Sequence, residues 1–218
     1  MATELVVLDG IEAIGRATLE RLAGPVVAVS GGSTYEMVFP FWNPMGSRRI
    51  EFLPVDERRV ELADAGSNWA RTIQLLLEPN GLSRQAANWA PTAAKLDEVV
   101  RRAVPTRVGQ IPSIPQVWLG MGGDGHTASL FPNGRELTDT TSLALDTISP
   151  IAPPFRSTLG LAALRAAGEI FAIVTGKAKG PVLRRALDGD RSLPFALALE
   201  GRESTVFVDT DCARAARL

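Results

Sequence analysis

The chain has 218 residues, 45% of them hydrophobic and 22% charged, and these proportions are typical of a globular protein with a buried core. A formal net charge of −1 excludes the basic surplus that nucleic-acid-binding domains usually carry, so we expect no nucleic-acid partner. Because this length lies within the usual size of one domain, residues 1–218 are expected to form a single domain.

Cysteine content and hydropathy indicate the compartment. Cys212 is the only cysteine, so no intramolecular disulfide can form, which suits a reducing environment. The chain does not begin with a basic segment followed by a long apolar stretch, as a secretory signal does. No window approaches the roughly 18 uninterrupted apolar residues of a membrane span. We therefore expect a cytoplasmic protein with no membrane partner.

Short apolar runs alternate along the chain with amphipathic segments. The first amphipathic segment follows Asp9, a plausible helix N-cap, and the later ones cover 69–77, 92–103 and 182–187. The apolar runs predict buried strands, because they are short, β-branched and bounded by glycine, proline or acidic residues; they lie at 26–30, 50–55, 117–120, 170–174 and 206–209. This alternation predicts a doubly wound α/β fold, in which a mostly parallel sheet has helices on both faces.

Three of the predicted strands run directly into loops that carry polar residues. These loops are 30–34, 56–58 and the glycine-rich segment 120–132. Ligands of such sheets bind at the carboxyl ends of the strands, so all three loops are expected to open on the same edge.

The loop at 30–34 has the sequence SGGST and precedes an apolar segment. Its paired glycines let backbone N–H groups converge on an anion, and the hydroxyl groups add donors at a helix N-terminus. A plain strand-to-helix turn with a Ser or Thr cap is the alternative. The loop is not a Walker A motif, because no Gly-Lys-Ser/Thr follows it.

Charged residues follow two other strands. Arg58 has the planar guanidinium that forks onto a phosphate, and Asp56 can accept hydrogen bonds from sugar hydroxyls. A solvated charge run is the alternative interpretation. Only three of the 23 basic residues are lysines, and Lys177 and Lys179 lie together at the start of the helix that follows the strand 170–174. Either lysine can supply further positive charge to a phosphate.

His126 is the only histidine, and it lies in the segment 120–132, GMGGDGHTASLFP. Histidine is the side chain whose unperturbed pKa lies near neutrality, so this position predicts a general base. Asp124 or Asp56 would orient the imidazole or the sugar, and the sequence leaves both open. The amides of Gly122 and Gly123 are candidates for stabilising an oxyanion. A turn histidine that caps a helix is the alternative.

The same segment also matches a dinucleotide-binding fingerprint. Gly120, Gly122 and Gly125 have the required spacing, and Asp146 lies near the place of the ribose-binding acid. However, Asp124 puts a carboxylate where a pyrophosphate would approach, and that motif does not require a histidine. We therefore expect no nicotinamide cofactor. A lone histidine and a lone distant cysteine make no convincing ligand set, so no metal is expected either.

Taken together, these motifs resemble those of the 6-phosphogluconolactonase family. SGGST, DER at 56–58, SN at 67–68, the segment 120–132, PFRSTL at 154–159 and GKAK at 176–179 occur in the family's order. The match extends from about residue 30 to 209, and the segment containing His126 is its most specific part. The resemblance implies a fold of the glucosamine-6-phosphate deaminase type and hydrolysis of 6-phosphoglucono-δ-lactone without a cofactor.

The resemblance also implies a set of site residues. The catalytic residues would be His126 and Asp124, and the substrate would contact Gly31, Gly32, Ser33, Thr34, Asp56, Arg58, Gly122, Gly123, Arg156 and Lys179. For the lysines, the family's Gly-x-x-Lys spacing favours Lys179. Two positions depart from the family's pattern: Tyr35 replaces a usual proline, and Ser157 replaces a usual aliphatic residue.

Two alternative functions remain to be compared. An amino-sugar phosphate deaminase also carries Asp-Gly-His, but its loop continues with Ile-Ala-Phe-Asn-Glu-Pro, and the chain has no glutamate there. A sugar-phosphate-sensing domain of a transcriptional regulator shares the fold, but it normally follows a DNA-binding helix pair. The anion-binding loop begins already at residue 30, and the histidine favours chemistry over sensing.

Overall fold

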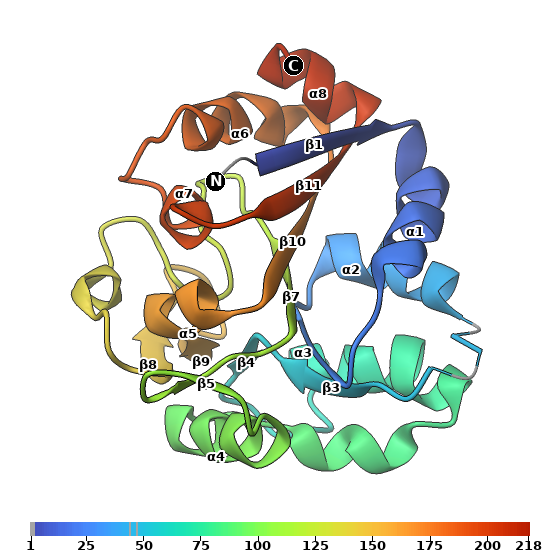
Figure 1. Cartoon of the computed structure of the whole chain (residues 1–218), viewed down its shortest axis with the longest axis vertical. Helices are drawn as coiled ribbons and strands as arrows, with labels where there is room; N and C mark the ends of the chain where they lie inside the picture. The colour runs from blue at the N-terminus through green and yellow to red at the C-terminus, as the bar shows by residue number, and fades with distance from the viewer. Residues whose placement is uncertain (1–2, 44, 47) are drawn as a thin grey trace.

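The computed structural model describes residues 3–43, 45–46 and 48–218 (Figure 1). At its centre lies a six-stranded sheet in which every neighbouring pair is parallel, in the order β1-β11-β10-β7-β2-β3. The strands are β1 (Thr3–Leu8), β2 (Val26–Val29), β3 (Glu51–Pro54), β7 (Gln116–Gly120), β10 (Glu169–Val174) and β11 (Ser204–Asp209).

Five of these strands confirm the strands predicted from the apolar runs. The sixth, β1, was not predicted; it is an edge strand whose residues are exposed or only half-buried. Its residues 5–8, LVVL, form a short apolar run like those of the other strands, so the sequence carried a signal that the prediction missed.

Helices cover both faces of the sheet, as the doubly wound prediction requires (Figure 1). Alternate residues of β2 separate the two cores: Val27 and Val29 pack with the first group of helices, whereas Val26 and Ala28 pack with the second. The first face holds α1 (Gly10–Arg21), α2 (Ser33–Val38), η1 (Phe39–Trp42), α3 (Asn68–Thr72) and η2 (Ile73–Leu77). The second holds α4 (Ala93–Ala103), α5 (Leu161–Ala166), α6 (Gly180–Leu187), α7 (Pro194–Leu199) and α8 (Thr210–Ala216).

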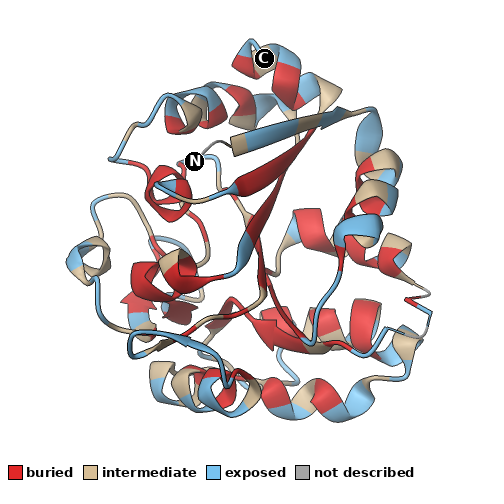
Figure 2. Ribbon diagram, viewed as in Figure 1, coloured by how far each residue is buried: buried red, intermediate tan, exposed pale blue. Residues whose placement is uncertain are grey.

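The predicted helices are confirmed in position. Thr92 caps α4 through a hydrogen bond from the backbone N–H of Lys95, whereas Asp9 occupies the N-cap of α1 without bonding to it. Buried residues line the inner surfaces of these helices and of the sheet (Figure 2). Among the described residues, no helix has the length and apolar character needed to cross a membrane.

A second, antiparallel sheet joins the carboxyl edge of the first. It consists of β4 (Asp56–Arg58), β9 (Phe155–Leu159) and β8 (Ala144–Ile148). Val55 connects the two sheets, because its N–H donates to Val29 and its carbonyl accepts from Leu159. The prediction of a loop at 56–58 is therefore wrong. Its polar side chains suggested a solvent-exposed segment, but the strand pairs with β9 and is mostly buried.

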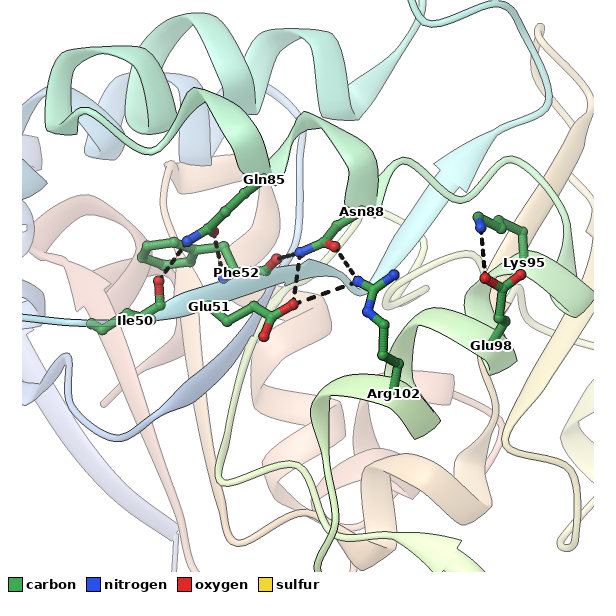
Figure 3. A network of polar contacts seen from close by, with 8 residues as sticks. All are labelled: Ile50, Glu51, Phe52, Gln85, Asn88, Lys95, Glu98 and Arg102. Carbon is green, nitrogen blue, oxygen red and sulfur yellow. Dashed lines mark hydrogen bonds and ion pairs between the residues drawn. The ribbon is translucent and has the colours of Figure 1, made fainter.

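The outer edge of β3 is closed by side chains instead of another strand (Figure 3). Gln85 accepts a hydrogen bond from the N–H of Phe52 at 2.8 Å and donates to the carbonyl of Ile50 at 2.7 Å. Asn88 donates to the carbonyl of Phe52 at 2.7 Å and accepts from Arg102 at 2.5 Å. Both amides come from the 3₁₀ segment η4 (Ser83–Asn88), so this segment satisfies the backbone groups that β3 turns away from β2.

The remaining elements are short. A short hairpin lies in the connection from α4 to β7. Its strands, β5 (Arg107–Val108) and β6 (Ile111–Pro112), have two residues each. Three further 3₁₀ segments are η3 (Glu78–Asn80), η5 (Arg135–Thr138) and η6 (Lys177–Lys179).

Candidate active site

A cavity of about 220 Å³ opens at the carboxyl edge of the central sheet, where the second sheet meets it. All three polar segments singled out in the sequence contribute to its wall. Its lining residues are Ser30, Gly31, Gly32, Ser33, Thr34, Tyr35, Asp56, Arg58, Asn68, Gly120, Met121, Gly122, His126, Ala128, Arg156 and Lys179.

The loop 30–34 turns from β2 into α2 along one side of this cavity. Gly32 occupies the N-cap of α2 with φ of 87° and ψ of 175°, a conformation that is essentially restricted to glycine. The first backbone N–H groups of a helix have no partner within it, and here they begin at Ser33. Ser30 is only 5% exposed, and no described residue bonds its hydroxyl group. The loop therefore offers several donors to one anion.

Tyr35, which departs from the family's pattern, holds this loop against the neighbouring strand. Its fully buried hydroxyl group donates to the carbonyl of Leu119 at 3.0 Å, and burial raises its pKa well above the ordinary value. Its ring packs near Phe39 and Trp42, with centroids 5.6 and 6.3 Å away. Tyr35 therefore ties the start of α2 to the end of β7, from which the His126 loop departs.

The strand β4 presents Asp56 and Arg58 to the cavity from one face. Asp56 is buried and accepts a hydrogen bond of 2.6 Å from the Ser129 hydroxyl group. Arg58 donates through Nη1 to the carbonyl of Gly66 at 2.7 Å, and its buried Nε has no partner among the described residues.

Glu57 points the other way and is completely buried. Its carboxylate accepts hydrogen bonds from Ser67 Oγ at 2.8 Å, Asn68 N at 2.8 Å and Trp69 N at 2.7 Å, and a fourth from Arg58 N. Burial raises the pKa of Glu57, and these hydrogen bonds oppose the rise. Glu57 thus caps the start of α3 and fixes it beside β4.

Arg156 lies directly opposite Arg58 in the β4–β9 pair. Its Nε donates to the carbonyl of Pro153 and its Nη2 to the hydroxyl of Ser149. Burial, followed by the neighbouring charge of Arg58, lowers the pKa of Arg156. Like charges directly opposite one another destabilise a sheet, and no described carboxylate forms an ion pair with either arginine. An anion in the cavity would relieve this repulsion.

His126 faces the cavity and is backed by Asp124. Its Nδ1 lies 2.5 Å from Asp124 Oδ1, and its backbone N–H donates to the same oxygen at 3.1 Å. Burial works against the charge of Asp124, but these bonds and the nearby imidazole outweigh it, so the pKa of Asp124 lies below its ordinary value. Between the two carboxylates considered from the sequence, the structure pairs Asp124 with the imidazole and places Asp56 on the cavity wall.

The two glycines considered for an oxyanion differ in position, because Gly122 lines the cavity and Gly123 does not. The ring of His126 lies over Gly122, where a Cβ atom would overlap it, and the N–H of Gly122 donates to the carbonyl of His126 at 2.9 Å. The amide of Gly122 is therefore not free for an oxyanion. Gly123 is exposed and lies outside the cavity lining, because a hydrogen bond from Gly125 to Gly122 places it at the tip of a tight turn. These positions argue against the oxyanion role of the two amides, whereas contact of Gly122 with substrate stays a prediction.

Lys179, rather than Lys177, lines the cavity; Lys177 is exposed. Burial lowers the pKa of Lys179, while Cys212 and Asp209 oppose that change. Asp209 also accepts a hydrogen bond of 2.8 Å from Gly176 and so holds the turn that carries Lys179.

Several lining residues were not predicted as site residues. Ser30, Tyr35, Gly120, Met121 and Ala128 flank predicted motifs, so their proximity was implicit in the chain. Asn68 is different, because it reaches the cavity from the start of α3, and its only signal was the SN pair among the family's motifs.

Other sequence candidates lie away from the cavity. Asp146 stands on β8 and pairs with Arg59 at 2.6 Å. Ser157 is buried and donates to the carbonyl of Ala90. Within the described ranges, no group of three or more His, Cys, Asp or Glu side chains is placed to hold a metal ion.

Known proteins match this arrangement over most of its length. The family described as glucosamine-6-phosphate isomerases/6-phosphogluconolactonase matches residues 6–207. The chain belongs to this family. A 6-phosphogluconolactonase from Treponema pallidum is 33% identical over 182 residues, covering 78% of this chain and 75% of the relative. One from Neisseria meningitidis is 30% identical over 210 residues, covering 88% and 87%.

A solved structure supports the fold of this family member. The 6-phosphogluconolactonase of Leishmania guyanensis superimposes with a TM-score of 0.81, covers 98% of each chain and is 22% identical. The fold expected from the resemblance is therefore confirmed. The family includes both lactonases and isomerases, so the reaction depends on the residues around the cavity.

Proposed function

We propose that this protein is a 6-phosphogluconolactonase, which hydrolyses 6-phosphoglucono-δ-lactone to 6-phosphogluconate. The observation that carries the proposal is the His126–Asp124 pair, which faces a cavity whose wall also contains three cationic side chains. This arrangement matches a substrate with a hydrolysable carbonyl at one end and a phosphate at the other. The names of the two sequence relatives support the same activity.

In the proposed mechanism, His126 acts as general base and then as general acid. Because Nδ1 is held by Asp124, Nε2 is the nitrogen that takes a proton from water. The resulting hydroxide attacks the lactone carbonyl and forms a tetrahedral intermediate. When this collapses, the bond from C1 to the ring oxygen breaks, and the imidazolium returns its proton to that oxygen. Asp124 stabilises the imidazolium and fixes the orientation of the ring.

The rest of the cavity is proposed to bind the phosphorylated sugar. The loop containing Gly31, Gly32, Ser33 and Thr34 supplies donors to the phosphate, with positive charge from Arg58, Arg156 and Lys179. Asp56 accepts hydrogen bonds from sugar hydroxyl groups. No cofactor or metal takes part in these steps.

This activity would make the protein the second enzyme of the oxidative pentose phosphate pathway, acting in the cytoplasm.

The direct test is proton release when purified, chelator-treated protein is mixed with freshly made 6-phosphogluconolactone. We expect release well above the spontaneous rate. The same preparation is then given glucosamine 6-phosphate and assayed for ammonia. Ammonia release at a comparable rate, or a lactone rate equal to the spontaneous one, would overturn the proposal.

Two variants extend this test to the phosphate. Arg58→Ala and Lys179→Ala each remove a charge-assisted hydrogen bond, so kcat/KM for the phosphorylated lactone should fall about 10- to 150-fold. The effect on unphosphorylated gluconolactone should be much smaller. Equal losses on both substrates would mean that these side chains shape the fold and do not bind the phosphate.

A further inference from the structure

Asn68 is a polar residue of the cavity wall whose side-chain amide is open to the cavity. The residue is 7% exposed and lines the cavity. Its backbone N–H is bonded to Glu57 and its carbonyl to Thr72, but no described residue bonds its side-chain amide. The amide is therefore a donor and acceptor group that the protein leaves available to whatever occupies the cavity.

The position of this amide is fixed from two sides. Glu57 accepts hydrogen bonds from Ser67, Asn68 and Trp69, so the first turn of α3 cannot move without breaking them. On the other side, the Asn68 side chain packs against Gly31, where a Cβ atom would overlap its amide group. Asn68 therefore touches the anion-binding loop directly.

The same segment also holds Arg58. Its guanidinium donates to the carbonyl of Gly66, two residues before Asn68, so both side chains reach the cavity from one rigid unit. The His126 loop leaves β7, whereas this unit follows β3, which lies two strands away in the sheet. Asn68 therefore reaches the cavity beside the loop 30–34 and Arg58.

We propose that Asn68 donates its Nδ2–H to the phosphoryl group of the substrate, beside the loop 30–34 and Arg58. The assignment rests on the proposed function and adds a neutral donor to the cationic groups already described. Glu57 acts as a positioning residue, because it sets the first turn of α3 without reaching the cavity.

The test compares Asn68→Asp and Asn68→Ala in calorimetric titrations with 6-phosphogluconate and with inorganic phosphate. The Asp variant keeps the shape but replaces the donor by a carboxylate that repels the phosphate dianion. We expect Asn68→Ala to weaken 6-phosphogluconate binding about 10- to 150-fold, and Asn68→Asp to weaken it further. Phosphate binding should weaken in the same order.

Asn133→Asp is the matched control. Asn133 is exposed, lies outside the cavity lining and has φ of 62°, which Asp also tolerates, so it makes the same charge change without touching the substrate. Its affinity for both ligands should equal that of the unaltered protein. Thermal unfolding of all three variants checks that each is folded. If Asn68→Asp does not fold, the binding measurements on Asn68→Ala test the proposal.

Two results would overturn the assignment. If Asn68→Asp binds 6-phosphogluconate as tightly as the unaltered protein, the amide contacts a hydroxyl group or nothing, since a carboxylate still accepts from a hydroxyl. If Asn68→Ala binds phosphate normally, the contact is likewise elsewhere. Failure of the proposed function is distinct, because the unaltered protein would then not hydrolyse the lactone, whatever the variants bind.

Discussion

His126 and Asp124 provide the first test at the scale of single residues. His126→Ala should fold normally, because the ring is about one-third exposed, at 31% of its side-chain surface. Loss of a general base lowers kcat by about 10²–10⁴-fold. Asp124→Asn keeps a hydrogen-bond acceptor but loses the charge that stabilises the imidazolium, so we expect a smaller fall. Steady-state proton release measures both. Turnover near normal in His126→Ala would remove the imidazole from the mechanism.

The charge of Lys179 predicts how ligand binding depends on pH. The protonated ammonium attracts phosphate and the neutral amine does not, so affinity falls as pH rises through the pKa of Lys179. Burial lowers that pKa from the ordinary value of about 10.4, so the loss should begin at lower pH than for an exposed lysine. Titration calorimetry with 6-phosphogluconate from pH 7 to 10 measures this change without the alkaline hydrolysis that a lactone suffers.

The groups around Lys179 do not produce the same effect. Burial raises the pKa of Cys212 to about 11, so its thiol stays neutral through most of that range. Lys179→Arg is the control, because a guanidinium remains protonated throughout this pH range. The affinity of this variant for 6-phosphogluconate should therefore not change with pH. A flat profile in the unaltered protein would show that Lys179 does not bind the phosphate.

At the scale of elements, two adjacent glycines in the loop 30–34 predict different defects. A Cβ on Gly31 would overlap the amide of Asn68, so Gly31→Ala should displace the start of α3 and raise KM. A Cβ on Gly32 meets no atom within 4 Å, but its φ of 87° strains any other residue. Gly32→Ala should therefore lower the free energy of unfolding by about 1–3 kcal/mol.

Urea unfolding and KM measurements on the two variants separate these effects. We expect the larger rise in KM in Gly31→Ala and a clear loss of stability in Gly32→Ala. If Gly31→Ala binds substrate normally, the close packing of α3 on this loop does not matter for the site.

The elements that could be predicted from the sequence are those whose burial comes from apolar side chains. The strands β2, β7 and β10 are buried on both faces, so their runs of valine, leucine and isoleucine identify them. The second sheet has no such signal. In β4 and β9, polar side chains are buried because they bond to residues of neighbouring segments or face the cavity, and a pattern of hydrophobic residues cannot represent this.

The same distinction applies to the site. His126, Arg58 and Lys179 were identifiable because their chemistry is specific and their segments follow strands. Asn68 was not identifiable as a site residue, because an asparagine at the start of a helix is usually an ordinary cap. Its position depends on Glu57, which lies 11 residues earlier and was indistinguishable from a solvated charge in the sequence.

At the scale of the whole molecule, the cavity exists because the chain leaves one sheet for another at its carboxyl edge. Val55 bonds to both sheets, so β4 is a direct continuation of β3 with a different pairing partner. The parallel sheet supplies the loops, and the antiparallel sheet supplies Arg58 and Arg156. Any change that loosens β3 is therefore expected to disturb the cavity from a distance.

The outer edge of β3 allows this to be tested (Figure 3). Gln85→Ala combined with Asn88→Ala leaves the N–H and carbonyl of Phe52 and the carbonyl of Ile50 without their partners. Each buried group left unsatisfied costs about 1–3 kcal/mol, and an uncovered strand edge is a template for pairing with another chain. The double variant should thus unfold at lower urea concentration and associate as protein concentration rises.

Arg84→Ala is the matched control, because Arg84 is exposed on the same 3₁₀ segment and makes no hydrogen bond to β3 among the described residues. Urea unfolding measures stability, and light scattering after size exclusion measures association. Lactone hydrolysis should decline in the double variant before global unfolding, since β3 leads directly into the strand that carries Arg58. If both variants behave alike, water replaces the side-chain amides without loss, and the edge of β3 does not need its cover.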